Sequence, residues 1–268
     1  MQAFDVLYQA APSPSSDVLP AALSTIYGGG LSLDDVAVYG NYVQSLDGIA
    51  TIPGVTSVGS VLSGRDQADR FLMALLRARA AAVLIGGATL RETPGHQWTP
   101  EHVYPELSEH FAAYRRNLGL PLEPRLVVLS ASGRLDPGHA ALRSGALILT
   151  SKRSAPRLRD ALPSCEVAAL GNGPELELDA VLARIHELVG RPVLVEAGPL
   201  LSGQMLQWRL LTDVFLTLSP VFAGGGEDRS GVTRGLELLP SAGAWAVLDS
   251  VRRHGSHLFL RYRMDRSS

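Results

Sequence analysis

Three segments of the sequence place polar side chains or glycines directly after a predicted strand, which is where ligands bind in open α/β sheets. They are residues 41–48 (Asn-Tyr-Val-Gln-Ser-Leu-Asp-Gly), 86–89 (Gly-Gly-Ala-Thr) and 196–203 (Glu-Ala-Gly-Pro-Leu-Leu-Ser-Gly). Glycines at a strand-to-helix turn let backbone N–H groups approach a phosphate, and a helix N-terminus adds a partial positive charge. The two glycine turns together therefore predict a site for a dinucleotide pyrophosphate. Turns of this composition also occur where the chain merely reverses, and that alternative stays open.

A carboxylate stands at the end of one of these predicted strands. Glu196 follows the apolar run 193–195, where a charged group is costly unless it is paired, hydrogen-bonded or open to a ligand. We interpret Glu196 as facing a ligand cleft, with a solvated strand end as the alternative. Asp47 is interpreted as a brace for its own turn, and the glycines at 224–226 as a turn.

Other catalytic patterns are weak. The sequence has no Gly-x-Ser-x-Gly elbow, and its single cysteine, Cys165, lies in a predicted strand as a small structural side chain. His254 and His257 flank a predicted hairpin turn and are expected at the surface, and no metal site is predicted. Arginines alternate along the same strands, which indicates a solvated face rather than a nucleic-acid groove; they are Arg252, Arg253, Arg261, Arg263 and Arg266.

The composition is that of a soluble globular protein. The chain has 268 residues, of which 46% are hydrophobic, and 24 Lys and Arg oppose 26 Asp and Glu. A formal charge of −2 argues against nucleic acid or an anionic membrane as the main partner. No apolar run approaches the roughly 20 residues that a bilayer requires, and residues 1–5 lack a basic leader. A single cysteine fits a reducing compartment, so we expect a cytoplasmic protein.

Strands and helices alternate along most of the chain. Strands are expected near 36–42, 81–85, 126–129, 146–149 and 193–195, and helix 178–188 shows one apolar face. Ser63, with Asp66 three residues later, resembles a capping box and predicts a helix that runs to about Arg79. Residues 1–33 are expected to form an arm and residues 34–268 one domain. The pattern predicts a mainly parallel sheet with helices on both faces, and residues 245–264 predict an antiparallel hairpin at its edge.

Taken in order, these segments resemble the reductase domain of riboflavin biosynthesis, the pyrimidine reductase family with a dihydrofolate-reductase-like fold. The resemblance spans about residues 36 to 264, and its motifs are 41–48, Ser57, 75–78, 84–89, 193–201, 213–220 and 224–226. It implies a three-layer α/β/α fold whose central sheet is mostly parallel and carries a C-terminal antiparallel hairpin. It also implies a homodimer that uses NADPH to reduce the ribosylamino group of a phosphorylated aminopyrimidine.

The resemblance also implies roles for individual residues. Glu196 and Asn41 would be catalytic, while Ser57, Arg77 and Glu196 would bind the small-molecule substrate, with Arg77 pairing with its phosphate. The residues implied for the cofactor are Val43, Gly86, Thr89, Thr93, Val127, Val128, Leu129, Ser130, Gly198, Pro199, Leu200, Leu201, Ser202, Gly203 and Gln204.

The chain departs from the family pattern between residues 92 and 98. The family usually has an acidic pair there, followed by Pro-x-Leu-Thr and a basic residue. Here Thr93 stands where the acid is expected, Glu92 is the candidate to replace it, and the arginine that binds the substrate phosphate has no match. A single cysteine cannot form the zinc site of the family's deaminase domain, so the chain would be a reductase only. A dihydrofolate or other pteridine reductase and a non-catalytic nucleotide-binding protein are the alternatives.

Overall fold

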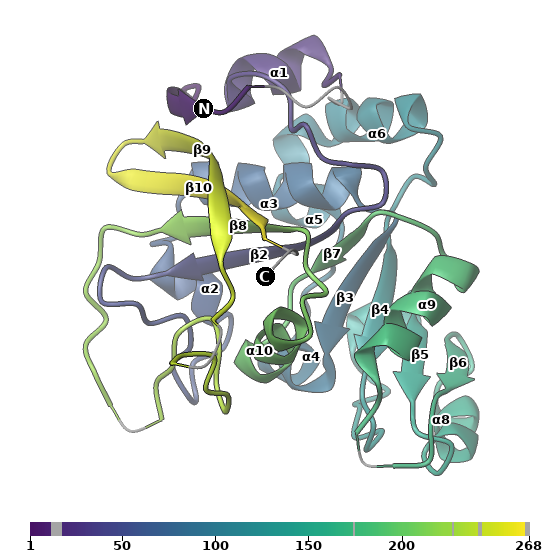
Figure 1. Cartoon of the computed structure of the whole chain (residues 1–268). Coiled ribbons are helices and arrows are strands. Elements are labelled where there is room, and N and C mark those ends of the chain that lie inside the picture. Colours follow the sequence, from purple (N-terminus) through teal and green to yellow (C-terminus); the bar gives the residue numbers. More distant parts are fainter. Residues whose placement is uncertain (12–17, 174, 227, 241–242, 266–268) are drawn as a thin grey trace.

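The computed structural model describes residues 1–11, 18–173, 175–226, 228–240 and 243–265 of the chain (Figure 1). Its strands are β1 (Asp5–Gln9), β2 (Val38–Gln44), β3 (Ala82–Gly86), β4 (Arg125–Leu129), β5 (Leu147–Thr150), β6 (Glu166–Ala169), β7 (Val193–Val195), β8 (Asp213–Leu218), β9 (Ala246–His254) and β10 (His257–Met264).

The helices connect these strands. They are α1 (Ala21–Tyr27), α2 (Val58–Leu62), α3 (Gln67–Arg79), α4 (Gly87–Glu92), α5 (Pro100–Val103), the 3₁₀ turn η1 (Pro105–Leu107), α6 (Ser108–Asn117), α7 (Ala140–Arg143), α8 (Ala155–Ala161), α9 (Leu178–Leu188) and α10 (Pro199–Gln207). Within the described ranges, no helix is both long and apolar enough to cross a bilayer.

All strands belong to one 10-stranded sheet in the order β1-β9-β10-β8-β2-β7-β3-β4-β5-β6. Neighbouring strands from β8 to β6 run parallel, whereas β10 pairs antiparallel with both β8 and β9. The predicted mostly parallel sheet with a C-terminal antiparallel hairpin is therefore confirmed. Because β2, β7 and β3 are neighbours, their carboxyl ends meet at one edge of the sheet.

The central parallel strands β3 and β7 carry no polar side chain because both of their faces are covered. Along β3, Val83 and Ile85 join the core under α3 and α6, while Leu84 joins the core under α9 and α10. The α3 side also receives α1, α5, α7 and α8, so helices lie on both faces of the sheet (Figure 1). This arrangement is the three-layer α/β/α architecture expected from the sequence.

Helix α3 begins three residues later than the capping box predicts. The Asp66 carboxylate accepts hydrogen bonds from the backbone N–H groups of Ala68 (2.8 Å) and Asp69 (3.1 Å), so Asp66 is the N-cap. Ser63 instead ends the short helix α2. The prediction of Ser63 as the cap was wrong because the helix starts three residues further on, where the Asp66 carboxylate accepts from the first-turn N–H groups. The helix does end at Arg79, as expected.

The segment before residue 34 packs onto the antiparallel part of the sheet. β1 pairs antiparallel with β9, and the side chains of Phe4, Leu23 and Tyr27 are buried in the main core. The Arg252 guanidinium lies 3.9 Å from the centre of the Tyr27 ring and donates to the Tyr27 carbonyl. The arm is therefore held by the hairpin that closes the chain.

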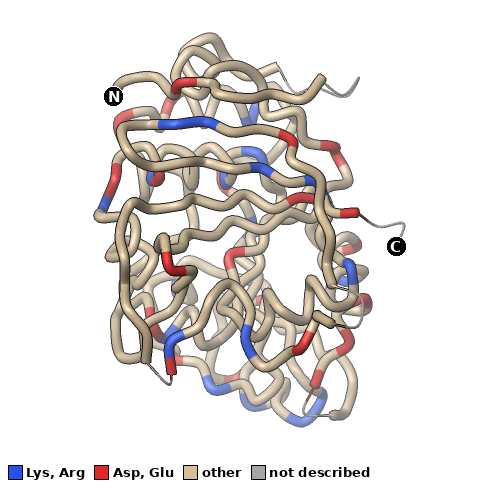
Figure 2. Tube along the Cα trace, turned by 60° about the vertical axis from the view of Figure 1, so that its left-hand side comes forward, with Lys and Arg blue, Asp and Glu red and all other residues tan. Residues whose placement is uncertain are grey.

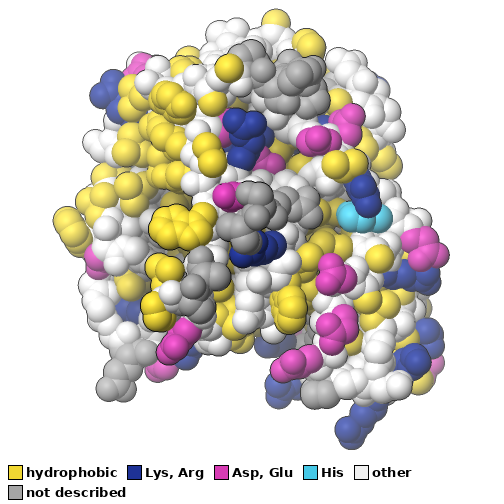
Figure 3. Space-filling view, viewed as in Figure 1, with side chains coloured by type: hydrophobic (Ala, Val, Ile, Leu, Met, Phe, Trp, Pro, Cys, Tyr) yellow, Lys and Arg dark blue, Asp and Glu magenta, His cyan; other side chains and the backbone are white. Residues whose placement is uncertain are grey.

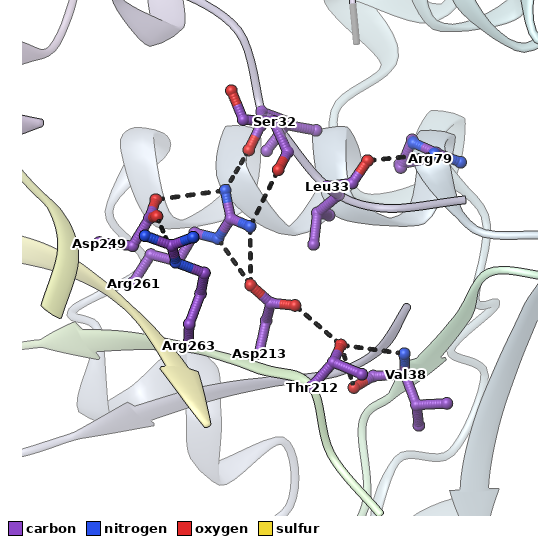
Figure 4. A network of polar contacts seen from close by, with 10 residues as sticks. Ser32, Leu33, Val38, Arg79, Thr212, Asp213, Asp249, Arg261 and Arg263 are labelled. Carbon is purple, nitrogen blue, oxygen red and sulfur yellow. Dashed lines mark hydrogen bonds and ion pairs between the residues drawn. The ribbon is translucent and has the colours of Figure 1, made fainter. Parts of the chain in front are cut away.

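The interpretation of the hairpin arginines as a solvated face was wrong for Arg252 and Arg261, whose side chains are buried. The Arg261 guanidinium pairs with Asp213 (2.7 Å) and Asp249 (3.3 Å) and donates to the carbonyls of Leu31 and Ser32 (Figure 4). A buried cation needs such partners; here β8 and β9 supply the carboxylates, and the arm supplies the two carbonyls. Arg253 and Arg263 are half-exposed, and Arg266 lies outside the described residues.

The histidines of the hairpin are less exposed than expected. The side chains of His254 and His257 are 20% and 14% exposed, and their Nδ1 atoms lie 3.9 and 3.8 Å from a carboxylate oxygen of Asp66. The expectation of surface histidines was wrong because the hairpin folds back onto the start of α3. No cluster of three metal-ligating side chains occurs among the described residues.

One face of the antiparallel strands stays partly open. A cross-strand row joins Leu216 of β8, Leu260 of β10, Val251 of β9 and Tyr8 of β1. These side chains are only partly buried or exposed, and apolar side chains gather over this region in Figure 3. Charged positions of both signs are interspersed along the chain (Figure 2). This row of four apolar residues is named here the open face.

Candidate functional site

A cavity of about 220 Å³ opens at the carboxyl ends of β2, β7 and β3. Nine of the residues predicted from the sequence line it: Asn41, Val43, Ser57, Arg77, Thr89, Thr93, Glu196, Gly198 and Pro199. The structure therefore brings together the three segments that the sequence singles out. Asn41 and Val43 come from β2, and the helix α3 forms the facing wall.

Glu196 is open to this cavity, and Arg77 holds its carboxylate. The Arg77 Nε donates to both carboxylate oxygens (3.1 and 3.2 Å), and its Nη2 donates to Oε2 at 2.6 Å. The Glu196 side chain is 11% exposed, whereas that of Arg77 is 1% exposed. The Glu196 carboxylate is thus paired with Arg77 on one side and accessible from the cavity on the other. Pairing and access to a ligand are two conditions under which a charged group can occupy the end of a buried strand.

Arg77 has further partners within the protein. Its Nη1 donates to the carbonyls of Gln97 (3.2 Å) and Thr99 (3.5 Å). Its Nη2 also lies 3.0 Å from Nε2 of His96. The resemblance to the pyrimidine reductases implies that this guanidinium binds a substrate phosphate. The structure gives it protein acceptors instead, so its visible action is to position Glu196.

His96 is a neutral side chain at this point. Burial, followed by the positive charge of Arg77, lowers its pKa from 6.5 to about 2. Since an arginine can only donate, the His96 Nε2 must accept, and the ring hydrogen is on Nδ1. The ring packs edge-on against Trp98, with centroids 4.9 Å apart. His96 and Trp98 belong to the stretch where the chain departs from the family pattern, and both line the cavity.

The two glycine turns lie side by side. A Cβ added to Gly198 would lie 3.7 Å from the Thr89 hydroxyl oxygen, and one added to Gly86 would meet nothing within 4 Å. Gly198 is the N-cap of the nine-residue helix α10, and Pro199 occupies its first turn. The first-turn N–H groups of a helix have no intrahelical partner. Both features fit the close approach of a pyrophosphate that the sequence predicts.

Several residues expected at the cofactor have no accessible side chain. Val127 and Val128 are fully buried in opposite cores because β4 is covered on both faces. Leu201 and Ser202 face inward from α10, and the Ser202 hydroxyl donates to the Ala197 carbonyl at 3.0 Å. The burial of these four side chains contradicts the expectation that they contact the cofactor.

The remaining expected residues surround the two turns without lining the cavity. A Cβ added to Gly203 would lie 2.8 Å from Leu236, so this glycine serves close packing. Leu200 is exposed, Gln204 is half-buried, and Leu129 and Ser130 lie at and just beyond the end of β4. The Ser130 hydroxyl would lie 3.0 Å from a Cβ on Gly87, which places it beside the first glycine turn.

The last residue of α4 is an acid at the cavity. Glu92 lines the cavity, and its carbonyl accepts from the backbone N–H of Ser57 at 3.1 Å. The Thr93 hydroxyl donates to the Thr89 carbonyl at 2.7 Å, so it closes the end of α4. Ser57 has a left-handed backbone (φ 52°), which is uncommon for a residue other than glycine.

Sequence reasoning missed Asp69 and Met73, which line the cavity from α3. With Arg77 they form a series spaced by four residues, which marks one face of a helix. Burial raises the pKa of Asp69 from 3.8 to about 6, and the side chains of Thr217 and Ser63 beside it oppose this shift. The four-residue spacing of these residues is visible in the sequence. An aspartate in an otherwise apolar helix face, however, does not by itself indicate that its side chain is buried.

Two other sequence interpretations concern residues outside the cavity. Asp47 accepts from the Ser45 hydroxyl (2.5 Å) and from the backbone N–H groups of Ala223 (3.0 Å) and Gly224 (2.7 Å). These bonds, led by that of Ser45, lower the pKa of Asp47 to about 2 and confirm its bracing role. Cys165 is half-buried, and its thiol donates to the Leu142 carbonyl.

An open α/β sheet with this strand order and a cleft at its carboxyl edge defines the dihydrofolate-reductase-like fold of the pyrimidine reductases. The family model of the RibD C-terminal domain matches residues 37–240, and the chain belongs to this family. A comparison with curated proteins gives no match.

Solved structures share the fold at low sequence identity. A pyrimidine reductase-like protein from Corynebacterium diphtheriae is 22% identical, with a TM-score of 0.68 over 93% of this chain and 100% of that one. RibD from Acinetobacter baumannii is 19% identical, with a TM-score of 0.65 over 88% of this chain and 60% of that one. The riboflavin biosynthesis reductase Rib7 from Saccharomyces cerevisiae is 13% identical, with a TM-score of 0.58 over 86% of this chain and 90% of that one.

Proposed function

We propose that this protein is an NADPH-dependent reductase of a ribosylaminopyrimidine, acting by direct hydride transfer as in riboflavin biosynthesis. The observation that carries this proposal is the cavity that Asn41 and Glu196 line together with Thr89 and Gly198 of the paired turns. Membership in the RibD C-terminal domain family supports the reductase class. Hydride transfer needs two carbons held in contact more than it needs a nucleophile, so the absence of a catalytic serine or cysteine pattern is compatible with it.

The residues present fit a dinucleotide cofactor. Gly198 leaves room beside Thr89, and the first-turn N–H groups of α10 can donate to a pyrophosphate. Val43, on the neighbouring strand β2, would lie at the nicotinamide end. The chemistry that this nucleotide supplies when bound is hydride donation. A branched side chain at Gly198 would occupy the space that the pyrophosphate needs.

The other wall of the cavity would hold the substrate. Glu196, fixed by Arg77, can accept hydrogen bonds from the amino groups of a pyrimidine through its accessible side. The Asn41 amide and the Ser57 hydroxyl, both at the cavity, can pair with ring carbonyl and N–H groups. These three side chains would orient the heterocycle rather than react with it.

The reaction also needs a proton. A hydride added to the anomeric carbon of a ribosylamine breaks the bond to the ring oxygen, which keeps the electron pair and takes one proton. Asp69 lines the cavity and has a pKa of about 6. Near neutral pH its carboxyl group is therefore protonated in a fraction of the molecules. The Glu196 oxygens accept hydrogen bonds from Arg77, so we assign the proton transfer to Asp69.

Absorbance of the reduced nicotinamide tests the proposal. Purified protein with NADPH should oxidise it when the ribosylaminopyrimidine is added, and NADH should be a poorer donor. Faster oxidation with dihydrofolate would favour a pteridine reductase instead. Tight NADPH binding without oxidation on either substrate would favour a nucleotide-binding protein without turnover.

We also propose that the protein is a homodimer in the cytoplasm, joined through the open face. A single cysteine without a disulfide partner supports a reducing compartment. The apolar row on that face supports self-association, because a large exposed apolar surface is costly in a monomer. Leu260→Asp should shift the mass measured by light scattering from dimer to monomer. Leu122→Asp, at an exposed apolar residue elsewhere, is the control and should leave the dimer intact.

A further inference from the structure

One nitrogen of the Arg77 guanidinium contacts two groups at the cavity. Its Nη2 donates to Oε2 of Glu196 at 2.6 Å and lies 3.0 Å from Nε2 of His96. An arginine nitrogen carries hydrogens and cannot accept, so Nε2 of His96 is the acceptor and the ring hydrogen stays on Nδ1. Arg77 therefore fixes the tautomer of His96 and the position of the Glu196 carboxylate together.

The Nδ1–H group of His96 is left for a ligand. Among the described residues no group accepts a hydrogen bond from it, and Nδ1 is not one of the buried side-chain atoms that lack a partner. The ring is half-buried and lines the cavity, as Glu196 does. Burial, followed by the charge of Arg77, lowers the pKa of His96 to about 2, so Nδ1–H is a neutral donor near neutral pH.

The direction of this donor is set before a substrate binds. The His96 ring lies edge-on to Trp98, with centroids 4.9 Å apart, and edge-on to His102, with centroids 4.7 Å apart. Together with the contact at Nε2, these two neighbours restrain the ring on several sides. A donor that is already held in place loses little conformational freedom on binding, so its hydrogen bond contributes more fully to affinity and selectivity.

Glu196 and His96 offer opposite hydrogen-bonding groups to a heterocycle. An ionised carboxylate can only accept, and the Nδ1–H of His96 can only donate. Ring N–H and amino groups of a pyrimidine match the carboxylate, whereas a ring carbonyl matches the imidazole. An amino group in place of that carbonyl would bring two donors together and leave both without an acceptor in a partly buried site.

We infer that His96 is a specificity-determining residue whose Nδ1–H donates a hydrogen bond to a ring carbonyl oxygen of the substrate and so disfavours an amino group at that ring position. This inference rests on the proposed reductase function and adds one residue to its substrate wall. His96 lies in the stretch 92–98, where the chain departs from the family pattern, so the contact is a feature of this chain.

Three free pyrimidines test the inference on the protein loaded with NADP⁺. They are 5,6-diaminouracil and the two analogues in which an amino group replaces one or the other of its ring carbonyls. Calorimetric titration gives a Kd for each compound. We expect one analogue to bind at least about tenfold more weakly than the dione, the cost of an unsatisfied hydrogen bond. His96→Leu should abolish this preference, because it removes the donor.

Matched variants separate the donor from general packing. His96→Asn keeps an N–H near the position of Nδ1 and should retain the preference for the dione. His110→Leu, at an exposed residue of α6, should leave all three Kd values unchanged, and thermal melts check that each variant is folded. A preference for the dione that persists in His96→Leu would overturn the inference, as would equal binding of all three compounds by the unchanged protein.

Nitrogen-15 NMR of the unchanged protein provides a test that needs no substitution. Nδ1 of His96 should carry the hydrogen, Nε2 should carry none, and the Nδ1 signal should shift when 5,6-diaminouracil is added. A hydrogen on Nε2 would overturn the inference, because Nδ1 would then be an acceptor.

The reductase function is tested separately by NADPH oxidation with the ribosylaminopyrimidine. A preference for the dione that His96→Leu removes, without any oxidation, would support the role of His96 in binding and overturn the reductase function. Oxidation accompanied by the same preference in His96→Leu would overturn the inference alone. Binding of none of the three pyrimidines, without oxidation, would overturn both.

Discussion

The guanidinium of Arg77 and the carboxylate of Glu196 form a forked ion pair, with 2.6 Å between Nη2 and Oε2, across 119 residues of sequence. Arg77 belongs to α3, and Glu196 directly follows β7. The pair therefore fixes the helix that forms one wall of the cavity against the strand that forms its floor. It also sets the direction in which the accessible carboxylate oxygen faces.

Breaking this pair should destabilise the protein. Arg77→Met leaves a partly buried carboxylate without its partner, and we expect the free energy of unfolding to fall by about 3 kcal/mol. Glu196→Gln leaves the more deeply buried arginine unpaired and should cost a similar amount. Urea denaturation of both variants and of the double variant measures the coupling. Strictly additive effects would show that the two groups do not interact in the folded protein.

Gly198→Val should weaken NADPH binding without unfolding the protein. The backbone at Gly198 (φ −68°, ψ 170°) is open to any residue, and the nearest atom to an added Cβ is at an ordinary contact distance. The branched side chain would occupy the approach of the pyrophosphate, so we expect the Kd for NADPH to rise by about tenfold or more. Calorimetric titration measures it, with a thermal melt as the check on folding.

The control for this substitution is Gly225→Val. Gly225 also has open space around an added Cβ and no left-handed backbone, and it does not line the cavity. Its Kd for NADPH should match that of the unchanged protein. If Gly198→Val also left the affinity intact, the cofactor would bind elsewhere.

Asp69 should make stability depend on pH. Its pKa is raised from 3.8 to about 6 in the folded state, so the folded state holds the proton more tightly than the unfolded state does. This contribution to stability is fully present below pH 3.8 and is lost as the pH rises through about 6. Asp69→Asn removes the charge, and above pH 7 it should be more stable than the unchanged protein by roughly 3 kcal/mol.

Denaturation at two pH values checks this expectation. Near pH 4 the two proteins should differ little, and the difference should open as the pH rises. Asp160→Asn, at an exposed position of α8, should follow the unchanged protein at both pH values. Asp69→Asn should also slow NADPH oxidation while leaving the Kd for NADPH unchanged. Full turnover in this variant would remove Asp69 as the proton donor.

Arg261 should anchor the N-terminal arm. Arg261→Met removes the partner of Asp213 and Asp249 and the donor to the Leu31 and Ser32 carbonyls, and should lower the free energy of unfolding by about 3 kcal/mol. Limited proteolysis should then cut before residue 34 sooner. Arg263→Met removes a half-exposed partner of the same Asp249 and should cost less than about 1 kcal/mol. Equal protease resistance in both variants would show that the arm is held by other contacts.

Sequence periodicity was enough to predict the parallel strands, the helix 178–188, the closing hairpin and the three segments that meet at the cavity. Strand and helix patterns are local, since they follow from which faces of a short segment must be apolar. Parallel neighbouring strands all end at the same edge of the sheet. For this reason the sequence was enough to predict that Asn41, Gly86 and Glu196 lie near one another. The helix cap was misplaced because Ser63 and Asp66 are both good caps and local sequence does not rank them.

What the sequence by itself determined is the layered fold, the family and the two glycine turns, because their patterns lie in short segments of the chain. Only the tertiary structure decided which charges are buried and with whom. Arg77 bonds to Glu196 rather than being left for a ligand, Asp69 faces the cavity, and Arg252 and Arg261 turn inward to the arm. These charged side chains have partners up to 230 residues away in the sequence. The local sequence around a charged residue is the same whether its side chain is solvated or pairs with a buried partner, so it cannot predict which occurs.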